Sequence, residues 1–198
     1  MPLASVITNN LQPLGPLDPG AAPTALGADG NIGGNSFSFP LQHQEQSNWC
    51  WAALAVSVAQ FYDPETPWTT QCDLAGTEIG VNCCPTGTDP SHCNVPLTLP
   101  RGLNRVGHYA GRISDRPAKR IQIKEEIDAG RPLCAAISFA GTSIVHFVVI
   151  SAYSWTPTSF TVTVEDPISG HWTDLHLDDL KTDYGADHGF WTFTYWTE

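Results

Sequence analysis

The segment SNWCWAAL, residues 47–54, places one cysteine between two tryptophans at the start of an apolar helical pattern. Unpaired N–H groups give the first turn of a helix a partial positive charge, which stabilises a thiolate at that position. The thiolate is the nucleophilic form of cysteine, and the two flanking tryptophans would keep water away from it. We therefore predict that Cys50 is a nucleophile. The alternative is a structural cysteine buried between core aromatic side chains.

A nucleophilic cysteine needs a base, which is normally a histidine. His146 is the best placed of the seven histidines, because it opens the β-rich run HFVVISAY after the turn Gly141-Thr142-Ser143. This position predicts a rigidly held, partly exposed imidazole, and the alternative is an ordinary strand-end histidine. The other six are expected to be solvent histidines in loops or on polar strand faces: His43, His92, His108, His171, His176 and His188.

An imidazole base needs an acceptor that orients it. In the segment TVEDP, Asp166 ends the β-rich run that follows the run of His146, and Pro167 interrupts strand pairing there. Two neighbouring strands would place His146 and Asp166 side by side. We predict that Asp166 orients His146, although an Asp-Pro pair is also a common turn former.

The oxyanion of an acyl-transfer reaction needs hydrogen-bond donors that are in place before the reaction begins. The backbone N–H of Cys50 is one candidate. The segment QHQEQSNWC supplies three side-chain amides just upstream, those of Gln42, Gln44 and Gln46. Residue type alone does not choose among them, because glutamines in a polar loop are often merely solvated.

Two helices and a set of strands would have to position these residues. Residues 49–62 have apolar side chains at i, i+3, i+4 and i+7 and apolar residues on most other faces, which predicts a helix buried nearly all round. Ser47 or Asn48 is its expected N-cap, and Asp63-Pro64 ends it. Residues 63–117 are rich in Pro, Gly, Cys and Thr, and we expect loops, short helical turns and covalent staples there.

Residues 118–129 predict a second, amphipathic helix that Gly130 caps and Pro132 terminates. Its expected inward residues are Ile121, Ile123 and Ile127, and its expected outward residues are Lys119, Lys124 and Glu125. Five β-rich runs follow, at 132–139, 146–153, 160–166, 171–177 and 189–196. Helices first and strands afterwards are typical of an α+β fold.

Composition and charge limit the partners. Residues 1–36 hold five Pro, six Gly, two charges and no aromatic residue, so we predict a flexible N-terminal segment, with one folded domain at 37–198. The net charge of −11 argues against nucleic acid or an anionic membrane as the main partner. No apolar run approaches the ~20 residues of a membrane span, and no signal peptide is visible.

Four of the six cysteines crowd into residues 72–93, which favours an oxidising compartment and hence a secreted or exported protein. Two disulfides would pair Cys72 with either Cys83 or Cys84 and Cys93 with the other. Free thiols and a zinc site that includes His92 are the alternatives, although the spacing lacks the CxxC pairs of structural zinc sites. Cys134 lies in an apolar run and is expected to be a free, buried thiol.

Taken together, these motifs resemble the papain-like cysteine peptidases. In that family a glutamine lies six positions before the nucleophile, and Trp-Ala follows the cysteine at the start of the central helix, as in Gln44, Cys50, Trp51 and Ala52. The bacterial avirulence-effector (AvrRpt-type) branch, secreted by plant pathogens, is the closer likeness. The shared features extend over about residues 40–180: SNWCWAA, the TQCDLA…CC…CN run, EEIDAGRPL leading into HFVVISAY, and VEDP.

The resemblance implies a papain-like α+β fold in which a central buried helix packs against an antiparallel sheet. It implies a monomeric cysteine endopeptidase that cleaves protein or peptide substrates without a cofactor. A Cys50-His146-Asp166 triad would act through a thioester acyl-enzyme, and Gln44 would complete the oxyanion hole. The alternatives are acyl transfer or deamidation by the same triad, and an inactive binding module that keeps the fold.

Overall fold

The computed structural model describes residues 32–84 and 92–198. The helices are α1 (Cys50–Tyr62), α2 (Gln71–Ile79), α3 (Leu99–Val106), α4 (Arg120–Asp128) and α5 (Leu177–Thr182). The strands are β1 (Gly33–Ser36), β2 (Tyr109–Ser114), β3 (Leu133–Ser138), β4 (Val145–Trp155), β5 (Phe160–Asp166), β6 (His171–His176) and β7 (Phe190–Thr197).

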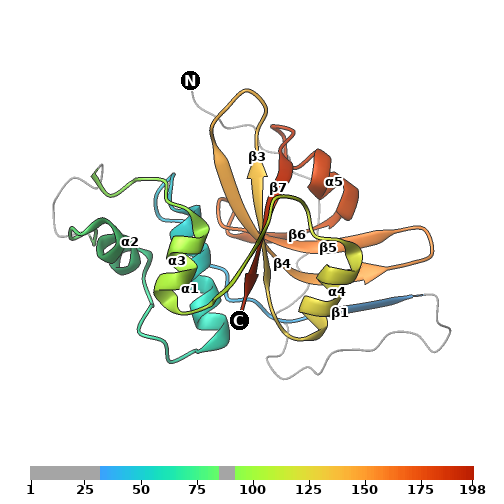
Figure 1. The fold of residues 1–198 in the computed structure, drawn as a ribbon, viewed down its shortest axis with the longest axis horizontal. Coiled ribbons are helices and arrows are strands. Elements are labelled where there is room, and N and C mark those ends of the chain that lie inside the picture. Colours follow the sequence, from blue (N-terminus) through green and yellow to red (C-terminus); the bar gives the residue numbers. More distant parts are fainter. Residues whose placement is uncertain (1–31, 85–91) are drawn as a thin grey trace.

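All the strands belong to one antiparallel sheet with the order β2-β7-β3-β4-β5-β6, and β1 pairs with β4 beside this path. In Figure 1, α1, α2 and α3 gather on one side of the molecule, and the sheet with α4 and α5 lies on the other. The α+β arrangement expected from the order of the patterns is therefore confirmed.

Helix α1 is the centre of the helical layer. Ten of its thirteen residues are buried, as predicted from its nearly uniform apolar composition. It packs against the sheet and against α3, where Gly102 lies so close that an added Cβ would sit 2.9 Å from the Cβ of Ala55. A side chain at Gly102 would therefore push α3 away from the helix that begins at Cys50.

The centre of the sheet is buried on both faces, and the alternation along β3 shows how. Cys134 and Ala136 face the cluster of apolar side chains formed with α1, α2 and α3. Leu133, Ala135 and Ile137 face the opposite cluster, which contains the buried apolar residues of α4 and α5. Successive strand residues point to opposite sides, so one short strand joins both halves of the core.

The predicted N-cap of α1 is wrong. Trp49 occupies the N-cap position and no side chain caps the helix. Ser47 and Asn48 instead hydrogen-bond with Asn94 from another loop. Their polar groups serve a contact between two segments, which local helix-start patterns do not reveal.

Helix α4 is shorter than predicted but lies where expected. Ile123 and Ile127 are buried, whereas Ile121 is 56% exposed, so its predicted inward orientation is wrong. In a helix, Ile121 lies about 200° around the axis from Ile123, which places the two side chains on different faces. Gly130, with φ of 70°, follows the C-cap Ala129 as predicted for a helix end.

The elements α5, β1 and β2 were not predicted, and α2 and α3 are helices of nine and eight residues where only short helical turns were expected. Gly33–Ser36, just before the predicted domain start at residue 37, pair with residues 152–155 of β4. Residues 1–31 of the predicted flexible segment lie outside the described residues. Among the residues that the structure describes, no helix has the length and apolar character required to cross a membrane.

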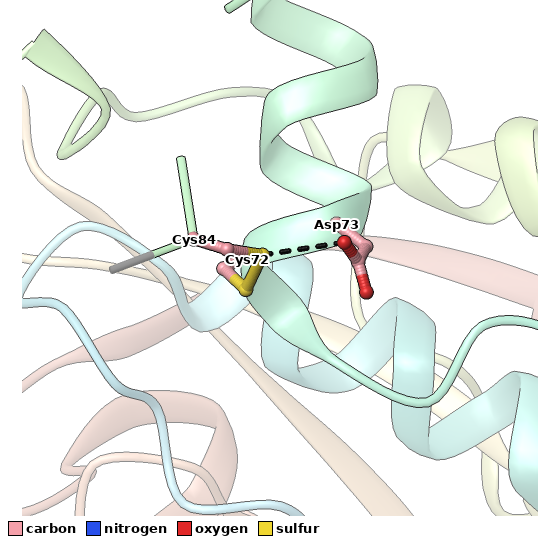
Figure 2. A group of neighbouring side chains, drawn as sticks. All are labelled: Cys72, Asp73 and Cys84. Carbon is pink, nitrogen blue, oxygen red and sulfur yellow. Dashed lines mark hydrogen bonds between the residues drawn. A yellow bond between two sulfur atoms is a disulfide. The ribbon is translucent and has the colours of Figure 1, made fainter. Parts of the chain in front are cut away.

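The two predicted disulfides are confirmed, and the structure chooses their connectivity. Cys72 is bonded to Cys84, and Cys83 to Cys93, while Cys50 and Cys134 are free and buried. Asp73 lies beside the first disulfide, with its Oδ1 3.2 Å from Cys84 Sγ (Figure 2). Because both sulfurs of this group are bonded to each other, they are not available as thiolate ligands for zinc.

We expect alkylation of denatured, non-reduced protein from an oxidising preparation to modify two cysteines, Cys50 and Cys134, as counted by peptide mass spectrometry. Burial raises the pKa of Cys134 to about 12, so this thiol should stay unmodified until the protein is denatured. Six alkylated cysteines would contradict the disulfide assignment, and one equivalent of zinc released with them would favour the metal site instead.

Candidate active site

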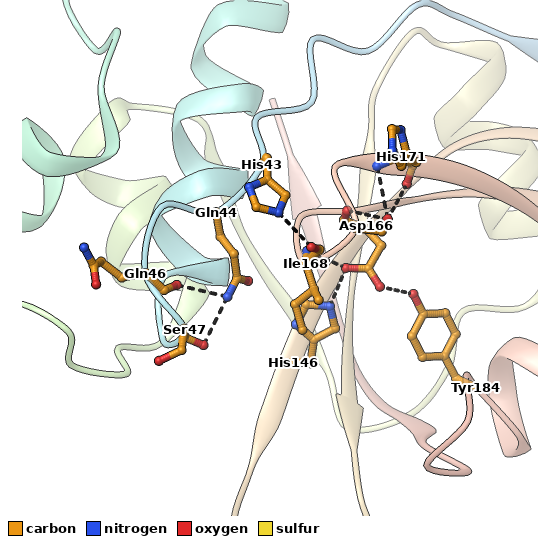
Figure 3. A network of polar contacts seen from close by, with 10 residues as sticks. His43, Gln44, Gln46, Ser47, His146, Asp166, Ile168, His171 and Tyr184 are labelled. Carbon is orange, nitrogen blue, oxygen red and sulfur yellow. Dashed lines mark hydrogen bonds and ion pairs between the residues drawn. The ribbon is translucent and has the colours of Figure 1, made fainter. Parts of the chain in front are cut away.

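Asp166 and His146 meet at one end of the hairpin formed by β4 and β5. His146 is the second residue of β4, and Asp166 is the last residue of β5. Nε2 of His146 lies 2.8 Å from Oδ1 of Asp166 (Figure 3). The sequence patterns therefore placed both residues correctly, because two consecutive antiparallel strands bring the start of one beside the end of the next.

Cys50 approaches the same imidazole from the helical layer. It is the first residue of α1, is 8% exposed, and lies close enough to the His146 ring to help raise the pKa of that imidazole. Since Nε2 of His146 is engaged by Asp166, Nδ1 is the ring nitrogen left for Cys50. His146 therefore lies between Cys50 and Asp166, and its hydrogen bond is with Asp166.

The electrostatics of the pair favour an imidazolium facing a carboxylate. Burial opposes charge on His146, but the combined effects of Asp166 and Cys50 outweigh burial and raise its pKa to about 9. Burial likewise opposes charge on Asp166, but the hydrogen bond and charge of His146, together with the donors Tyr184 and Ile168, outweigh burial and lower the pKa of the carboxyl group. His146 is therefore able to carry a proton at neutral pH.

The exposure predicted for His146 is wrong. The residue is 5% exposed, although Val145 before it is 40% exposed, because its imidazole is packed between Asp166 and Cys50. A buried imidazole between two neighbouring groups is held more firmly than an exposed one, which suits a group that must give up and take up protons at a fixed position.

Asp166 has two further donors that the sequence did not indicate. Its Oδ1 also accepts from the backbone N–H of Ile168 at 2.7 Å, and its Oδ2 accepts from the hydroxyl of Tyr184 at 2.6 Å. Tyr184 follows α5 in the chain, far from any recognisable motif. Only the fold brings it to the carboxylate.

Among the three upstream glutamines, Gln44 is the one whose backbone bonds with the residue next to Asp166. Its backbone N–H donates to the carbonyl of Pro167, next to Asp166, and its side chain is buried. The side chain of Gln42 instead donates to Gln60 and to the carbonyl of Thr69, away from Asp166.

The side-chain amide of Gln44 is held by its own loop. Nε2 donates to the carbonyls of Gln46 at 3.0 Å and Ser47 at 3.1 Å, while Oε1 is buried with no partner among the described residues (Figure 3). An amide that donates to an oxyanion would have to give up one of these two carbonyls. The loop between Gln44 and Cys50 therefore has to adjust during such a step.

The two tryptophans around Cys50 attach its segment to the loop after the second disulfide. Nε1 of Trp49 donates to the carbonyl of Cys93 at 2.7 Å, and Nε1 of Trp51 donates to the carbonyl of Val95 at 3.2 Å. Both indoles are fully buried. Their polar groups thus hold the first turn of α1 in place, a role beyond the exclusion of water.

A cysteine at a helix start, a histidine on a strand and an aspartate at the end of the next strand are the residue types that a cysteine peptidase uses, here on an α+β fold. Comparison with known families agrees, because the model of the Peptidase_C39 like family matches residues 37–189. The match covers more than half of the chain, and the protein belongs to this family. Its fold is papain-like. No curated protein matches the chain significantly.

Proposed function

We propose that this protein is a cysteine endopeptidase in which Cys50, His146 and Asp166 form the catalytic triad. Family membership supports cysteine peptidase activity on protein or peptide substrates. The observation that supports the triad most is the 2.8 Å hydrogen bond between His146 and Asp166, together with the effect of the nearby Cys50 on the pKa of the same imidazole. No cofactor takes part in this chemistry.

The proposed reaction has two halves. The Cys50 sulfur attacks the carbonyl carbon of the scissile amide, and the sulfur's proton resides on His146. The C–N bond then breaks while His146 gives that proton to the leaving amine, which leaves a thioester on Cys50. A water molecule, deprotonated by His146, attacks the thioester and releases the acid product and the cysteine.

The oxyanion of both tetrahedral intermediates would be held by the Cys50 N–H and by Gln44. The Cys50 N–H belongs to the first turn of α1, where backbone donors have no acceptor within the helix. Gln44 contributes once its amide turns from a loop carbonyl toward the oxyanion. Donors of this kind act on the transition state more than on the bound substrate.

We expect Gln44→Ala to lower kcat by about 10²–10³, the usual effect of losing one oxyanion donor. Gln42→Ala and Gln46→Ala provide matched controls in the same loop, and both should retain kcat within a few-fold. Steady-state cleavage of one peptide by the three variants makes the comparison. Equal kcat values for all three would remove Gln44 from the oxyanion hole.

We also propose three properties that were predicted from the sequence. The protein is a monomer, it is secreted or exported, and it is related to the avirulence-effector branch. The two disulfides support an oxidising environment. The same triad is also suited to deamidation or transfer of the acyl group to an amine, and the nature of the acceptor separates these reactions from hydrolysis.

The test is digestion of a proteome-derived peptide library by the wild-type protein and by Cys50→Ala, with new termini identified by mass spectrometry. New termini in the wild-type sample alone support the endopeptidase. Ammonia release or amine incorporation without new termini would indicate deamidation or acyl transfer. If the wild-type and Cys50→Ala samples were identical in new termini, ammonia release and amine incorporation, the result would favour a binding module.

A further inference from the structure

Tyr184 contacts the carboxylate of the proposed triad from an element that is remote in sequence. Its hydroxyl donates to Oδ2 of Asp166 at 2.6 Å (Figure 3). The other carboxylate oxygen, Oδ1, accepts from His146 and from the backbone of Ile168. Tyr184 is therefore the protein donor to Oδ2 among the described residues, and it fixes the plane of the carboxylate from the side opposite His146.

A tight turn fixes the position of Tyr184. Its N–H donates to the carbonyl of Gly189 at 2.7 Å, and the N–H of Gly189 donates back to the carbonyl of Tyr184 at 2.8 Å. An added Cβ at Gly189 would lie 2.6 Å from Ile137 and 2.8 Å from Phe139, so this turn sits directly on β3 and the residue after it. The packing of this turn on the sheet thus fixes the position of the Tyr184 hydroxyl.

We propose that Tyr184 is a positioning residue, which locks the Asp166 carboxylate in the orientation that accepts from His146. This inference rests on the proposed triad. Without the hydroxyl, Oδ2 would be left without this donor in a site where the Asp166 side chain is only 20% exposed. The carboxylate would then rotate to find other donors, and its bond with the imidazole would weaken.

Tyr184 acts as a neutral donor throughout. Burial and the neighbouring Asp166 charge raise its pKa far above the usual value for a tyrosine. The other titratable groups around Asp166 are His146 on β4, His171 opposite it on β6, and Glu165 on its own strand. His43 approaches through the carbonyl of Ile168, at 2.9 Å from its Nε2.

The test compares Tyr184→Phe with Tyr153→Phe. Tyr153 provides a matched control, because its hydroxyl also donates to a carboxylate, Oδ1 of Asp128, at 2.8 Å. Both variants keep the aromatic ring and lose one such bond. We expect Tyr184→Phe to lower kcat about tenfold with little change in KM, since a displaced catalytic group affects the reacting geometry more than binding. Tyr153→Phe should leave kcat unchanged.

The pH profile separates positioning from a general structural role. The bond with Asp166 supports the raised pKa of His146, so a weakened bond should move the alkaline limb of kcat/KM to lower pH in Tyr184→Phe. The proposal would be overturned if, in Tyr184→Phe, the alkaline limb of kcat/KM stayed at the same pH or moved to higher pH and kcat stayed within twofold of wild type.

A second readout does not depend on activity. The Nε2 proton of His146, held by Asp166, should give a far-downfield proton NMR signal that Tyr184→Phe weakens and Tyr153→Phe preserves. An unchanged signal in Tyr184→Phe would overturn the positioning role even if no substrate were cleaved. If the phenylalanine variant failed to fold, Gly189→Ala, which displaces the turn but keeps the hydroxyl, should produce the same weakening, and an unaltered signal there would equally contradict the proposal.

Discussion

Replacement of Cys50 by alanine should lower peptide cleavage by at least about 10³-fold, to the background of the assay. The reason is that no thioester forms without the sulfur, and removal of a triad nucleophile costs nearly all the catalysis that the triad provides. The fold should survive, since alanine is small and the first turn of α1 is held mainly by Trp49 and Trp51. Progress curves for purified wild type and variant give the ratio directly.

Cys134→Ala provides the matched control, because Cys134 is the other free, buried cysteine. It lies on β3 within the core, and it has no part in the proposed reaction. Its replacement should leave kcat within about twofold, with a lower melting temperature as the only effect of the small cavity. If Cys50→Ala retained activity, or if Cys134→Ala lost activity with the fold intact, the assignment of Cys50 as the nucleophile would be wrong.

Replacement of His146 by alanine should have an effect of similar size, because the thiol then loses its base and the leaving amine loses its acid.

In the wild type, the raised pKa of about 9 means that His146 keeps its proton throughout the neutral range. As the pH rises through 9, the imidazolium is lost, and the acid for the leaving group is lost with it. We therefore expect activity to persist to about pH 9 and to decline above it.

Asp166→Ala should move this alkaline limb to lower pH, because Asp166 is the leading contributor among the groups that raise the pKa of His146. Asp166→Asn should retain more activity than Asp166→Ala, since an amide oxygen still accepts from the imidazole. Asp174→Ala, an exposed change on β6, is the control and should leave the limb in place. If the activity of the wild type instead declined with a midpoint near pH 6.5, the His146–Asp166 pair would not hold its proton at neutral pH.

The candidate site could be predicted largely from local patterns, because each of its groups stands at a boundary that the sequence marks. Cys50 begins an apolar helix, His146 begins a strand, and Asp166 precedes a proline at the end of the next strand. Consecutive antiparallel strands are usually neighbours, so the contact between the last two followed from strand order. The burial of His146 did not follow, because it depends on where α1 crosses the sheet.

The missing parts depend on contacts between distant segments. Tyr184 reaches Asp166 only because a turn after α5 packs on β3. Strand β1 has the glycine-rich sequence GGNS, which lacks the alternation of apolar and polar residues that would predict a strand paired with β4. Helix α3 contains Pro100 and Gly102, residues that usually indicate loops. Here the proline stands in the first turn, where a missing N–H costs nothing, and the glycine allows close packing on α1.

The most direct test of the central claim is the rate of iodoacetamide labelling at Cys50 between pH 5.5 and 8, in the folded wild type and in His146→Ala. Peptide mass spectrometry assigns the label to Cys50, with Cys134 as the internal unlabelled control. If His146 and Cys50 form an ion pair, the wild-type rate should change only a few-fold over this range, and His146→Ala should be much slower at the acidic end. A rate that rises about tenfold per pH unit in both proteins would contradict the proposed catalytic pair.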